Sequence, residues 1–233
     1  MQIILEKKPK SPILISGFPG FGLVGTITTE FLIRHLDATL IGKVRVPEVA
    51  PLIAVHKGKP VEPLGIFYDK KYNLVIIHAL TSVEGLEWAL AEQVVHIAKD
   101  LKAREVVSVE GVGSSNPLSP ESTAFYLGAN KKLKSLGFQE LQEGIIVGVT
   151  GALLLRDDIP VTCIFAETHS SLPDSRAAAK VIEVLDKYLH LKVDYRPLIK
   201  NAERFEEKLR EVMEKKQAAA TTMKDVKKLT YLG

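Results

Sequence analysis

The sequence of 233 residues lacks the features that mark several large classes of protein. Its single cysteine, Cys163, rules out an internal disulfide framework, and the apolar run around it indicates a buried, unreactive thiol. No uninterrupted apolar stretch approaches the roughly 20 residues that a membrane-spanning helix needs. The first eight residues have neither the basic region nor the long apolar region of a secretory signal. We therefore expect a cytoplasmic protein without membrane contacts.

Motifs for enzymatic chemistry and metal binding are also scarce. There is no Gly-x-Ser-x-Gly elbow, which argues against a serine hydrolase, and no P-loop. The six histidines are scattered singly, and no His-x-x-x-His pair is present. His78 and His96 are expected at the edges of their elements. We expect no catalytic residues, no metal ion and no cofactor.

The net charge of +3 is small but unevenly placed. Residues 200–233 hold nine basic and six acidic side chains, which leaves 22 of each sign in residues 1–199. The body has no basic stripe interleaved with aromatic residues, so we expect no nucleic-acid binding. The positive C-terminal segment suits steering toward an acidic surface.

Short apolar runs rich in β-branched residues alternate with helical patterns along residues 1–197. This alternation predicts an α/β fold, with a mostly parallel sheet covered by helices on both faces. The segments 65–68 and 73–78 suit a hairpin, and 151–155 is ambiguous. The expected strands are 13–15, 39–46, 53–56, 65–68, 73–78, 105–109, 145–147 and 161–166, and the expected helices are 23–35, 84–101, 122–136 and 175–190.

Pro197 marks the end of the predicted core domain, residues 1–197. Residues 198–216 carry an apolar stripe with alternating spacings of four and three, which predicts an amphipathic helix. The stripe includes Phe205 and Leu209, which we expect at an oligomer interface. Since it is too short for a confident coiled coil, docking onto its own domain and onto a neighbouring subunit both remain open. Residues 217–233 are predicted to be a flexible spacer and tail.

Gly20, Gly22 and Gly25 spell Gly-x-Gly-x-x-Gly between a predicted strand and a predicted helix. In a dinucleotide fold such glycines let the backbone approach a pyrophosphate, and Glu48 stands about where a ribose-binding acid is sought. A nucleotide- or nucleoside-binding enzyme using residues 17–25 is therefore one interpretation. The other, which we favour, is a structural turn or subunit interface with an exposed apolar knob made by Phe18 and Phe21.

Two further polar segments follow predicted strands. Glu110 follows one strand, and Glu167 and His169 follow another, so the three side chains could meet at the carboxyl edge of the sheet. Ordinary helix capping is the alternative, because the same segments offer good capping residues in Ser119, Ser171 and Asp174.

The last residues form a basic tail with an apolar, tyrosine-bearing tip. Capture of a C-terminal carboxylate by a partner is a recurring mode of recognition, and this tip is suited to a pocket on another protein. Packing of the tail against its own domain is the alternative. The expected partner-binding residues are Lys224, Lys227, Lys228, Leu229, Thr230, Tyr231, Leu232 and Gly233.

The segment 17–25, Gly-Phe-Pro-Gly-Phe-Gly-Leu-Val-Gly, resembles the N-terminal signature of the archaeal branch of the proteasome assembly chaperone family. Segments 148–155 and 167–174 match the same family pattern. The resemblance implies an α/β fold similar to nucleoside phosphorylases but without their catalytic apparatus. It also implies homo-oligomers, for which a tetramer is a first guess, and work on the α-ring of the 20S proteasome.

Some members of this family end in a hydrophobic-tyrosine-any motif that enters pockets between α-subunits. In those members the tyrosine is penultimate, whereas Tyr231 is third from the end here. The resemblance therefore implies a non-enzymatic, ATP-independent assembly factor or activator that docks its tail into the α-ring. The offset of one residue leaves open whether Tyr231 and the terminal carboxylate both reach their usual partners.

Overall fold

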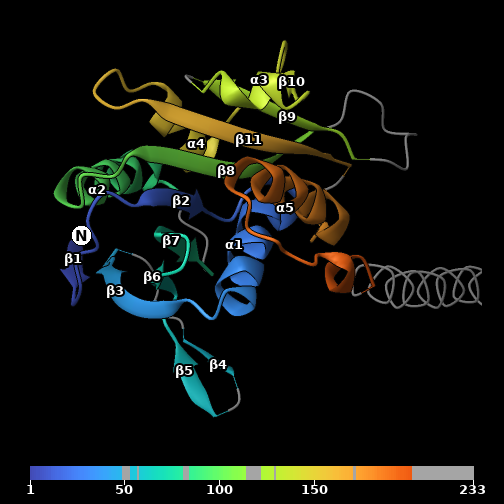
Figure 1. The fold of residues 1–233 in the computed structure, drawn as a ribbon. Helices are drawn as coiled ribbons and strands as arrows, with labels where there is room; N and C mark the ends of the chain where they lie inside the picture. Colours follow the sequence, from blue (N-terminus) through green and yellow to red (C-terminus); the bar gives the residue numbers. More distant parts are fainter. Residues whose placement is uncertain are drawn as a thin grey trace, which may run out of the picture.

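The structure is a computed structural model that describes residues 1–48, 53–56, 58–80, 84–113, 122–128, 130–169 and 172–200. These residues form a nine-stranded sheet in the order β1-β3-β6-β7-β2-β8-β11-β9-β10 (Figure 1). A two-stranded ribbon of β4 (Ala54–His56) and β5 (Lys59–Val61) projects from the body. The strands of the large sheet are β1 (Gln2–Leu5), β2 (Ile13–Gly17), β3 (Thr39–Arg45), β6 (Leu64–Asp69), β7 (Leu74–Ala79), β8 (Glu105–Gly113), β9 (Ala124–Gly128), β10 (Gln139–Glu140) and β11 (Val161–Thr168).

The sheet is parallel at its centre and mixed at its flanks. Strands β7, β2, β8 and β11 run parallel to one another, whereas β1, β3 and β6 join antiparallel on one side and β9 pairs antiparallel with β11. The predicted hairpin is confirmed as β6–β7. Every residue of β7 is buried, as expected of a central strand covered on both sides.

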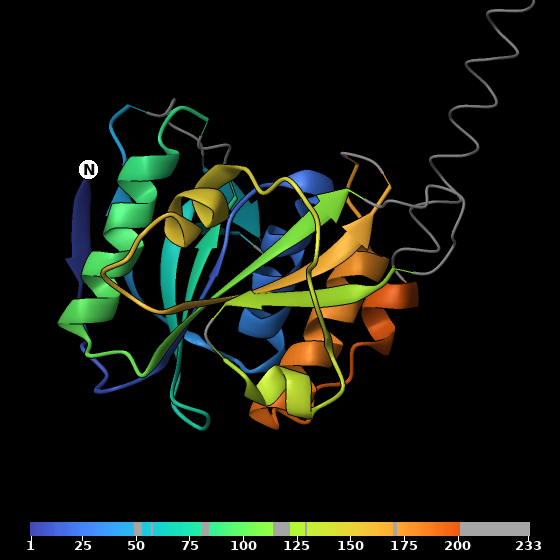
Figure 2. The same ribbon diagram turned by 90° about the horizontal axis from the view of Figure 1, so that it is seen from above.

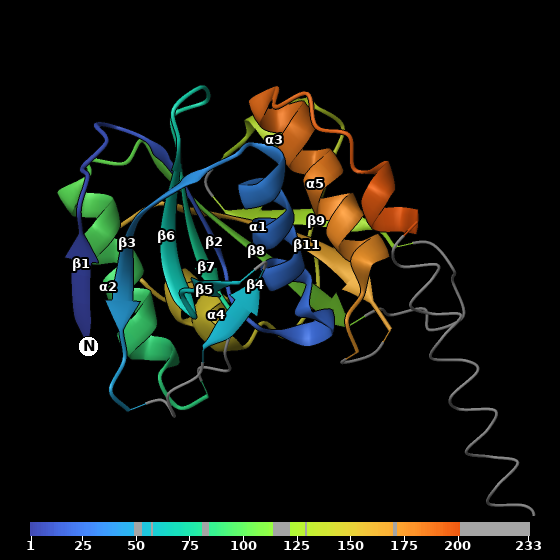
Figure 3. The ribbon, with the colours of Figure 1, turned by 90° about the horizontal axis from the view of Figure 1, so that it is seen from below.

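Helices cover both faces of the sheet, which confirms the predicted α/β class. Helices α1 (Val24–His35) and α5 (Ser175–Leu189) lie together on one face (Figure 3). Helices α2 (Glu87–Asp100) and α4 (Gly148–Leu154) lie together on the other (Figure 2). Each pair encloses its own apolar cluster against the sheet. A short 3-10 turn, η1 (Phe21–Leu23), precedes α1, and α3 (Lys132–Ser135) is a single turn.

Two sequence predictions were wrong. The helix expected over 122–136 begins instead with strand β9, where Phe125 and Tyr126 pair with β11 and point to opposite sides of the sheet, and of its described residues only the single turn of α3 is helical. The strand expected over 145–147 is irregular chain leading into α4, where the Ile145 side chain is 87% exposed. At β9 the pairing with β11, which a single segment does not reveal, outweighs local preference, whereas residues 145–147 have no strand partner among the described residues.

The start of the C-terminal segment lies on the body. Residues 196–200 are helical, and Leu198 is buried in the apolar cluster formed with α5. The rest of the predicted helix over 198–216, including Phe205 and Leu209, lies outside the described residues, as does the tail over 217–233. None of the described helices combines the length and apolar character needed to cross a bilayer.

Candidate functional site

The glycine-rich loop lies at the edge of the sheet where the parallel strands end. It leaves β2 at Gly17 and enters α1 at Val24, so it passes over the carboxyl ends of the neighbouring strands. The 3-10 turn η1 lies against β8. Active sites of open α/β sheets collect at this edge, so the loop lies where a ligand site of this fold would be expected.

Each glycine of the motif is explained by close contact with protein atoms. A Cβ atom on Gly20 would lie 2.3 Å from Glu110 Oε1, and one on Gly25 would lie 2.5 Å from the carbonyl oxygen of Val109. Gly22 has a φ of +65°, and its Cβ would lie 2.7 Å from Thr168 Oγ1. Gly22 and Gly25 therefore need glycine so that the loop can pack on β8 and β11, and a side chain at position 20 would displace the Glu110 carboxylate. A bound pyrophosphate is not needed to account for them.

Backbone hydrogen bonds hold the loop in place. The amide of Leu23 donates to the Gly20 carbonyl at 3.0 Å, and the amide of Asp174 donates to the Gly22 carbonyl at 2.9 Å. Asp174 is also the N-cap of α5, because its carboxylate accepts from the Ala177 amide at 2.9 Å and from Thr168 Oγ1 at 2.8 Å. The capping interpretation is confirmed for Asp174, while Ser119 and Ser171 lie outside the described residues.

The exposed knob expected from two phenylalanines is wrong for Phe18. Its side chain is 6% exposed and belongs to the core cluster beneath α2 and α4, so it is not available to a second subunit. Phe21 is 39% exposed at the turn of the loop. An interface role at this loop therefore stays a prediction for Phe21 alone.

Glu48 is not placed to serve the loop as a ribose-binding acid. It follows β3, and strands β6 and β7 lie between β3 and β2 in the sheet. In a dinucleotide fold the acid follows a strand adjacent to the one that carries the glycines. The Glu48 carboxylate instead lies 3.9 Å from the amino group of Met1.

Glu110 is buried under the glycine-rich loop, at the end of a row of hydroxyl groups. Ser16 Oγ lies 3.4 Å from Ser108 Oγ, which lies 2.9 Å from Thr150 Oγ1, and Thr150 is hydrogen-bonded to Glu110. Burial raises the pKa of Glu110 to about 7, and the hydrogen bond from Thr150 offsets part of this effect. We call Ser16, Ser108 and Thr150, together with the Glu110 carboxyl at their end, the hydroxyl row.

The pocket predicted from Glu110, Glu167 and His169 stays a prediction, because much of the chain that follows β8 and β11 lies outside the described residues. Glu110 is in register with Phe165, and Glu167 with Val112, so the two acids lie on the same face, two positions apart along the strands. Glu110 is turned into the protein, Glu167 is half-buried and His169 is exposed. Elsewhere among the described residues, two cavities lie along the outer side of α2, and His96 and Asp100 line both.

Replacing Glu110 by Gln should stabilise the protein at alkaline pH. A carboxyl whose pKa is raised by folding resists ionisation, so wild-type stability should fall as pH rises from about 4.5 to 7. At pH 8 the Glu110→Gln variant should be more stable by about 2–3 kcal/mol, and at pH 4 the two should be equal. Urea unfolding at both pH values measures this. Glu167→Gln, at the same edge, serves as control, and an equal gain there would contradict the explanation.

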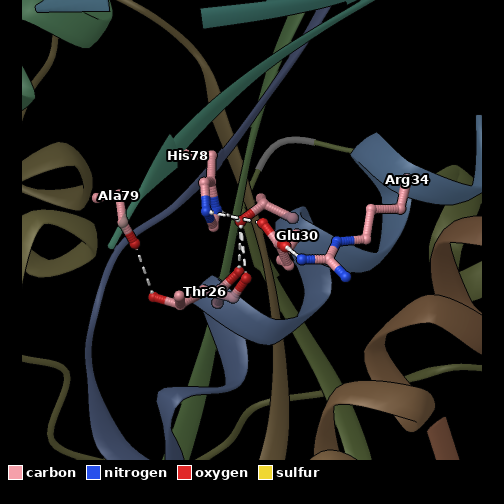
Figure 4. A network of polar contacts seen from close by, with 7 residues as sticks. Thr26, Glu30, Arg34, His78 and Ala79 are labelled. Carbon is pink, nitrogen blue, oxygen red and sulfur yellow. Dashed lines mark hydrogen bonds and ion pairs between the residues drawn. The ribbon is translucent and has the colours of Figure 1, made fainter. Parts of the chain in front are cut away.

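A second polar group, which the sequence did not reveal, joins β7 to α1 (Figure 4). His78 is fully buried on β7 rather than at an edge, and its Nδ1 lies 2.8 Å from Thr29 Oγ1. Its Nε2 lies 3.2 Å from Glu30 Oε2, close enough for an ion pair but outside good hydrogen-bond geometry. Glu30 is also ion-paired with Arg34, and Thr26 Oγ1 donates to the Ala79 carbonyl at 3.1 Å. His96, in contrast, is exposed on α2.

Neutralising Glu30 should weaken the attachment of α1. The contact with His78, assisted by Arg34, lowers the pKa of Glu30, so its contribution to stability should be present at neutral pH and lost on acidification. Glu30→Gln should cost about 1–2 kcal/mol at pH 7, with the difference from wild type shrinking below about pH 4. Arg34→Ala should cost less, because that side chain is largely exposed. Denaturant unfolding at the two pH values would decide, and a constant difference would contradict the assignment.

These features define an α/β protein whose glycine-rich loop resembles a nucleotide-binding loop in sequence but packs against its own sheet. The chain belongs to the PAC2 family, whose model matches residues 14–213. This confirms the family resemblance read from residues 17–25, 148–155 and 167–174.

Solved structures and a curated relative agree with this assignment. PbaA of Pyrococcus furiosus, an archaeal homologue of proteasome-assembly chaperone, is 33% identical, with a TM-score of 0.82 over 98% of this chain and 99% of that one. PbaB of the same organism, an archaeal proteasome activator, shares the fold at 23% identity, with a TM-score of 0.75 over 91% and 98% of the two chains. The uncharacterized protein MJ0106 of Methanocaldococcus jannaschii is 30% identical over 212 residues, covering 88% of this chain and 87% of that protein.

Proposed function

We propose that this protein is a non-enzymatic, ATP-independent factor that binds the 20S proteasome in the cytoplasm. It acts as an assembly factor or as a chaperone-like activator, and it docks its C-terminal tail into the α-ring. The observation that carries the proposal is the similarity, over nearly the whole of both chains, to PbaA, a homologue of a proteasome-assembly chaperone. The closed packing of the glycine-rich loop supports a body that serves as a platform rather than as a ligand site.

The proposed docking segment is the tail beyond the described residues. Leu229, Tyr231, Leu232 and the Gly233 carboxylate are its anchors, with Thr230 between them. Lys224, Lys227 and Lys228 steer the tail toward an acidic surface, and their effect should fade as salt is raised. The proposal includes both assembly and activation, because PbaA, the more similar of the two, is a homologue of an assembly chaperone and PbaB is a proteasome activator.

Several tails on one oligomer would strengthen a weak individual contact. Ordering a mobile peptide costs conformational entropy, so one tail should bind weakly. A homo-oligomer, for which we keep the tetramer as a working assumption, presents several tails at high effective concentration. Tails that bind the open α-ring better than the closed one would bias its gate toward opening.

The proposal is tested with purified components and no nucleotide. The full-length protein is mixed with mature 20S particles and, separately, with free α-subunits, and complexes are separated by size-exclusion chromatography. Co-elution with mature particles would support an activator, and co-elution with free α-subunits alone would support an assembly factor. Failure to bind either preparation would overturn the proposal.

A nucleotide- or nucleoside-binding enzyme remains the alternative to exclude. NAD, nucleosides and inorganic phosphate are each titrated in a thermal-unfolding assay, because a ligand that binds the native state raises its stability by mass action. We expect no shift. A rise in unfolding temperature that saturates with any one of these ligands would favour the alternative.

A further inference from the structure

The outer strand β1 is a short edge of the sheet that carries no charge, proline or bulge of its own. Among the described residues β1 pairs only with β3, and its sequence Gln-Ile-Ile-Leu has no charge and no proline. Natural edge strands are usually blunted by charges, proline or bulges. The amide of Glu6 donates to the Ile41 carbonyl at 2.8 Å. By the alternation of an antiparallel ladder, the backbone groups of Ile3 and Leu5 therefore face outward.

A groove lies directly beside this edge. β1 and α2 are neighbours at one end of the molecule (Figure 1), and a cavity of about 450 Å³ lies between them. Ile3 and Leu5 line it from β1, and Gln93, His96 and Ile97 line it from α2. The ion pair of Lys8 with Asp100, at 2.8 Å, also borders it and keeps its charge balanced. The lining is mixed, with apolar Ile3, Leu5 and Ile97 beside Lys8, Gln93, His96 and Asp100, so it can receive a leucine and the ring and hydroxyl of a tyrosine.

The edge strand and the groove together have the parts needed for strand addition. In that mode main-chain hydrogen bonds hold an extended segment, and a pocket receives its alternate side chains. The size of the site selects the occupant. A four-residue edge alone offers few contacts beside the roughly 20–30 residues per side of a typical stable interface. It matches an extended segment of about four residues.

We propose that residues 229–232 of this chain's own tail add to β1 as an antiparallel strand, with Leu229 and Tyr231 in the groove. Leu229 and Tyr231 are two positions apart, like Ile3 and Leu5, so both pairs share one face of the added strand. Pairing Leu229 with Leu5 and Tyr231 with Ile3 satisfies the outward backbone groups.

Charge favours this register. With Leu229 opposite Leu5, Lys228 stands directly opposite Glu6, which is exposed at the end of β1. Opposite charges at directly paired positions stabilise a sheet. Sliding the tail by two residues, the next register that keeps the hydrogen bonds, places Thr230 opposite Glu6 and loses the pair.

The tail is long enough to reach the groove. Between Lys200 and Leu229 lie 28 residues. With 201–216 helical as predicted, that part spans about 24 Å, and residues 217–228 span up to about 40 Å when extended. A compact body of this size has a radius of gyration of about 16 Å. The tether also gives the tail an effective concentration of the order of millimolar, so even a weak contact would be occupied.

The contact would give the tail a resting place on its own body. A four-residue strand with two apolar side chains is weak enough to be displaced by a better-fitting partner. The idea that this contact regulates docking of the tail into the α-ring rests on the function proposed above. The contact with β1 itself does not depend on that function.

The experiment compares full-length protein with a chain that lacks residues 228–233, using methyl NMR of Ile3, Leu5 and Ile97. We expect their signals to shift on truncation and to return when a peptide of residues 224–233 is added. N-methylation of the peptide at Leu229 and Tyr231 should weaken binding about tenfold or more, because it removes the amides that face β1. N-methylation at Thr230 and Leu232 should change binding less than about threefold.

Matched groove variants test the location. Gln93→Trp fills the groove and should abolish the peptide-induced shifts, whereas Glu92→Trp, at the neighbouring exposed position of α2, should not. Identical Ile3 and Leu5 signals in the full-length and shortened chains would overturn the proposal, as would equal binding of the two N-methylated peptides. A dimer of the shortened chain with Ile3 and Leu5 amides protected from exchange would assign the edge to a second copy instead. No proteasome is present, so failure here leaves α-ring docking untouched.

Discussion

Removal of residues 228–233 should abolish capture of the 20S proteasome while leaving the body folded and its assembly state unchanged. The deletion takes away every proposed anchor at once, and aromatic anchors alone often contribute about 2 kcal/mol or more. Loss of several tails from one oligomer also removes the avidity that holds the complex. The body should stay folded, because its two apolar clusters are formed by residues up to Lys200, and the four-residue contact proposed for the tail at β1 is weak. Pull-down with purified particles measures the first effect, and size-exclusion chromatography the second.

A single substitution should reproduce most of this loss. Tyr231→Ala is expected to weaken binding about thirtyfold or more. Thr221→Ala, in the predicted spacer, is its matched control and should bind as the wild type does. Undiminished capture by the deletion variant, or loss of its assembly state, would defeat the assignment of the tail.

Gly111→Ala should destabilise the protein by about 3–4 kcal/mol, a loss in the range of severe core substitutions. A Cβ atom at position 111 on β8 would lie 2.1 Å from the carbonyl oxygen of Phe21, a backbone atom of the glycine-rich loop. The loop is fixed by the Gly20–Leu23 and Gly22–Asp174 hydrogen bonds, so it cannot give way without breaking them. Denaturant unfolding gives the free-energy difference.

The same strand offers a matched control. Gly113 lies two residues further along β8, and a Cβ atom there would meet nothing within 4 Å. Gly113→Ala should therefore change stability by no more than about 0.5 kcal/mol. An equal loss of stability at the two positions would mean that the glycine-rich loop does not pack against β8 at Gly111. A loop used mainly for ligand binding would lose affinity, rather than stability, when its packing against β8 is disturbed.

Local patterns predicted the long helices and the β6–β7 hairpin because their signals lie within a few residues. The helix over 84–101 was read from its spacing of three and four, and α2 spans Glu87–Asp100. The order of the strands was not readable in this way. β1 was not expected at all, and β9 was read as helix, because its place is decided by β11, which follows it by more than 30 residues.

The candidate site was predicted in its parts but not in its arrangement. The turn made by Gly20, Gly22 and Gly25 was expected, but not that Glu110 would lie beneath it, since that depth depends on how the loop folds over β8. Nothing near His78 in the sequence points to Thr29, which is 49 positions away. Buried polar pairs of this kind arise when helices and strands pack together, so they produce no periodic pattern in the sequence.

The hydroxyl row has a consequence for the direction of its hydrogen bonds. Each of Ser16, Ser108 and Thr150 carries a single hydroxyl hydrogen, so each can donate to one neighbour at a time. Ser16 donates to Ser108. With Glu110 ionised, Thr150 donates to the carboxylate and Ser108 donates to Thr150; with Glu110 protonated, the acid can donate to Thr150, and the Ser108–Thr150 bond can reverse. Burial raises the pKa of Glu110 to about 7, so a pH change around neutrality reverses the hydrogen bond between Ser108 and Thr150 and, with it, the dipole beneath the loop.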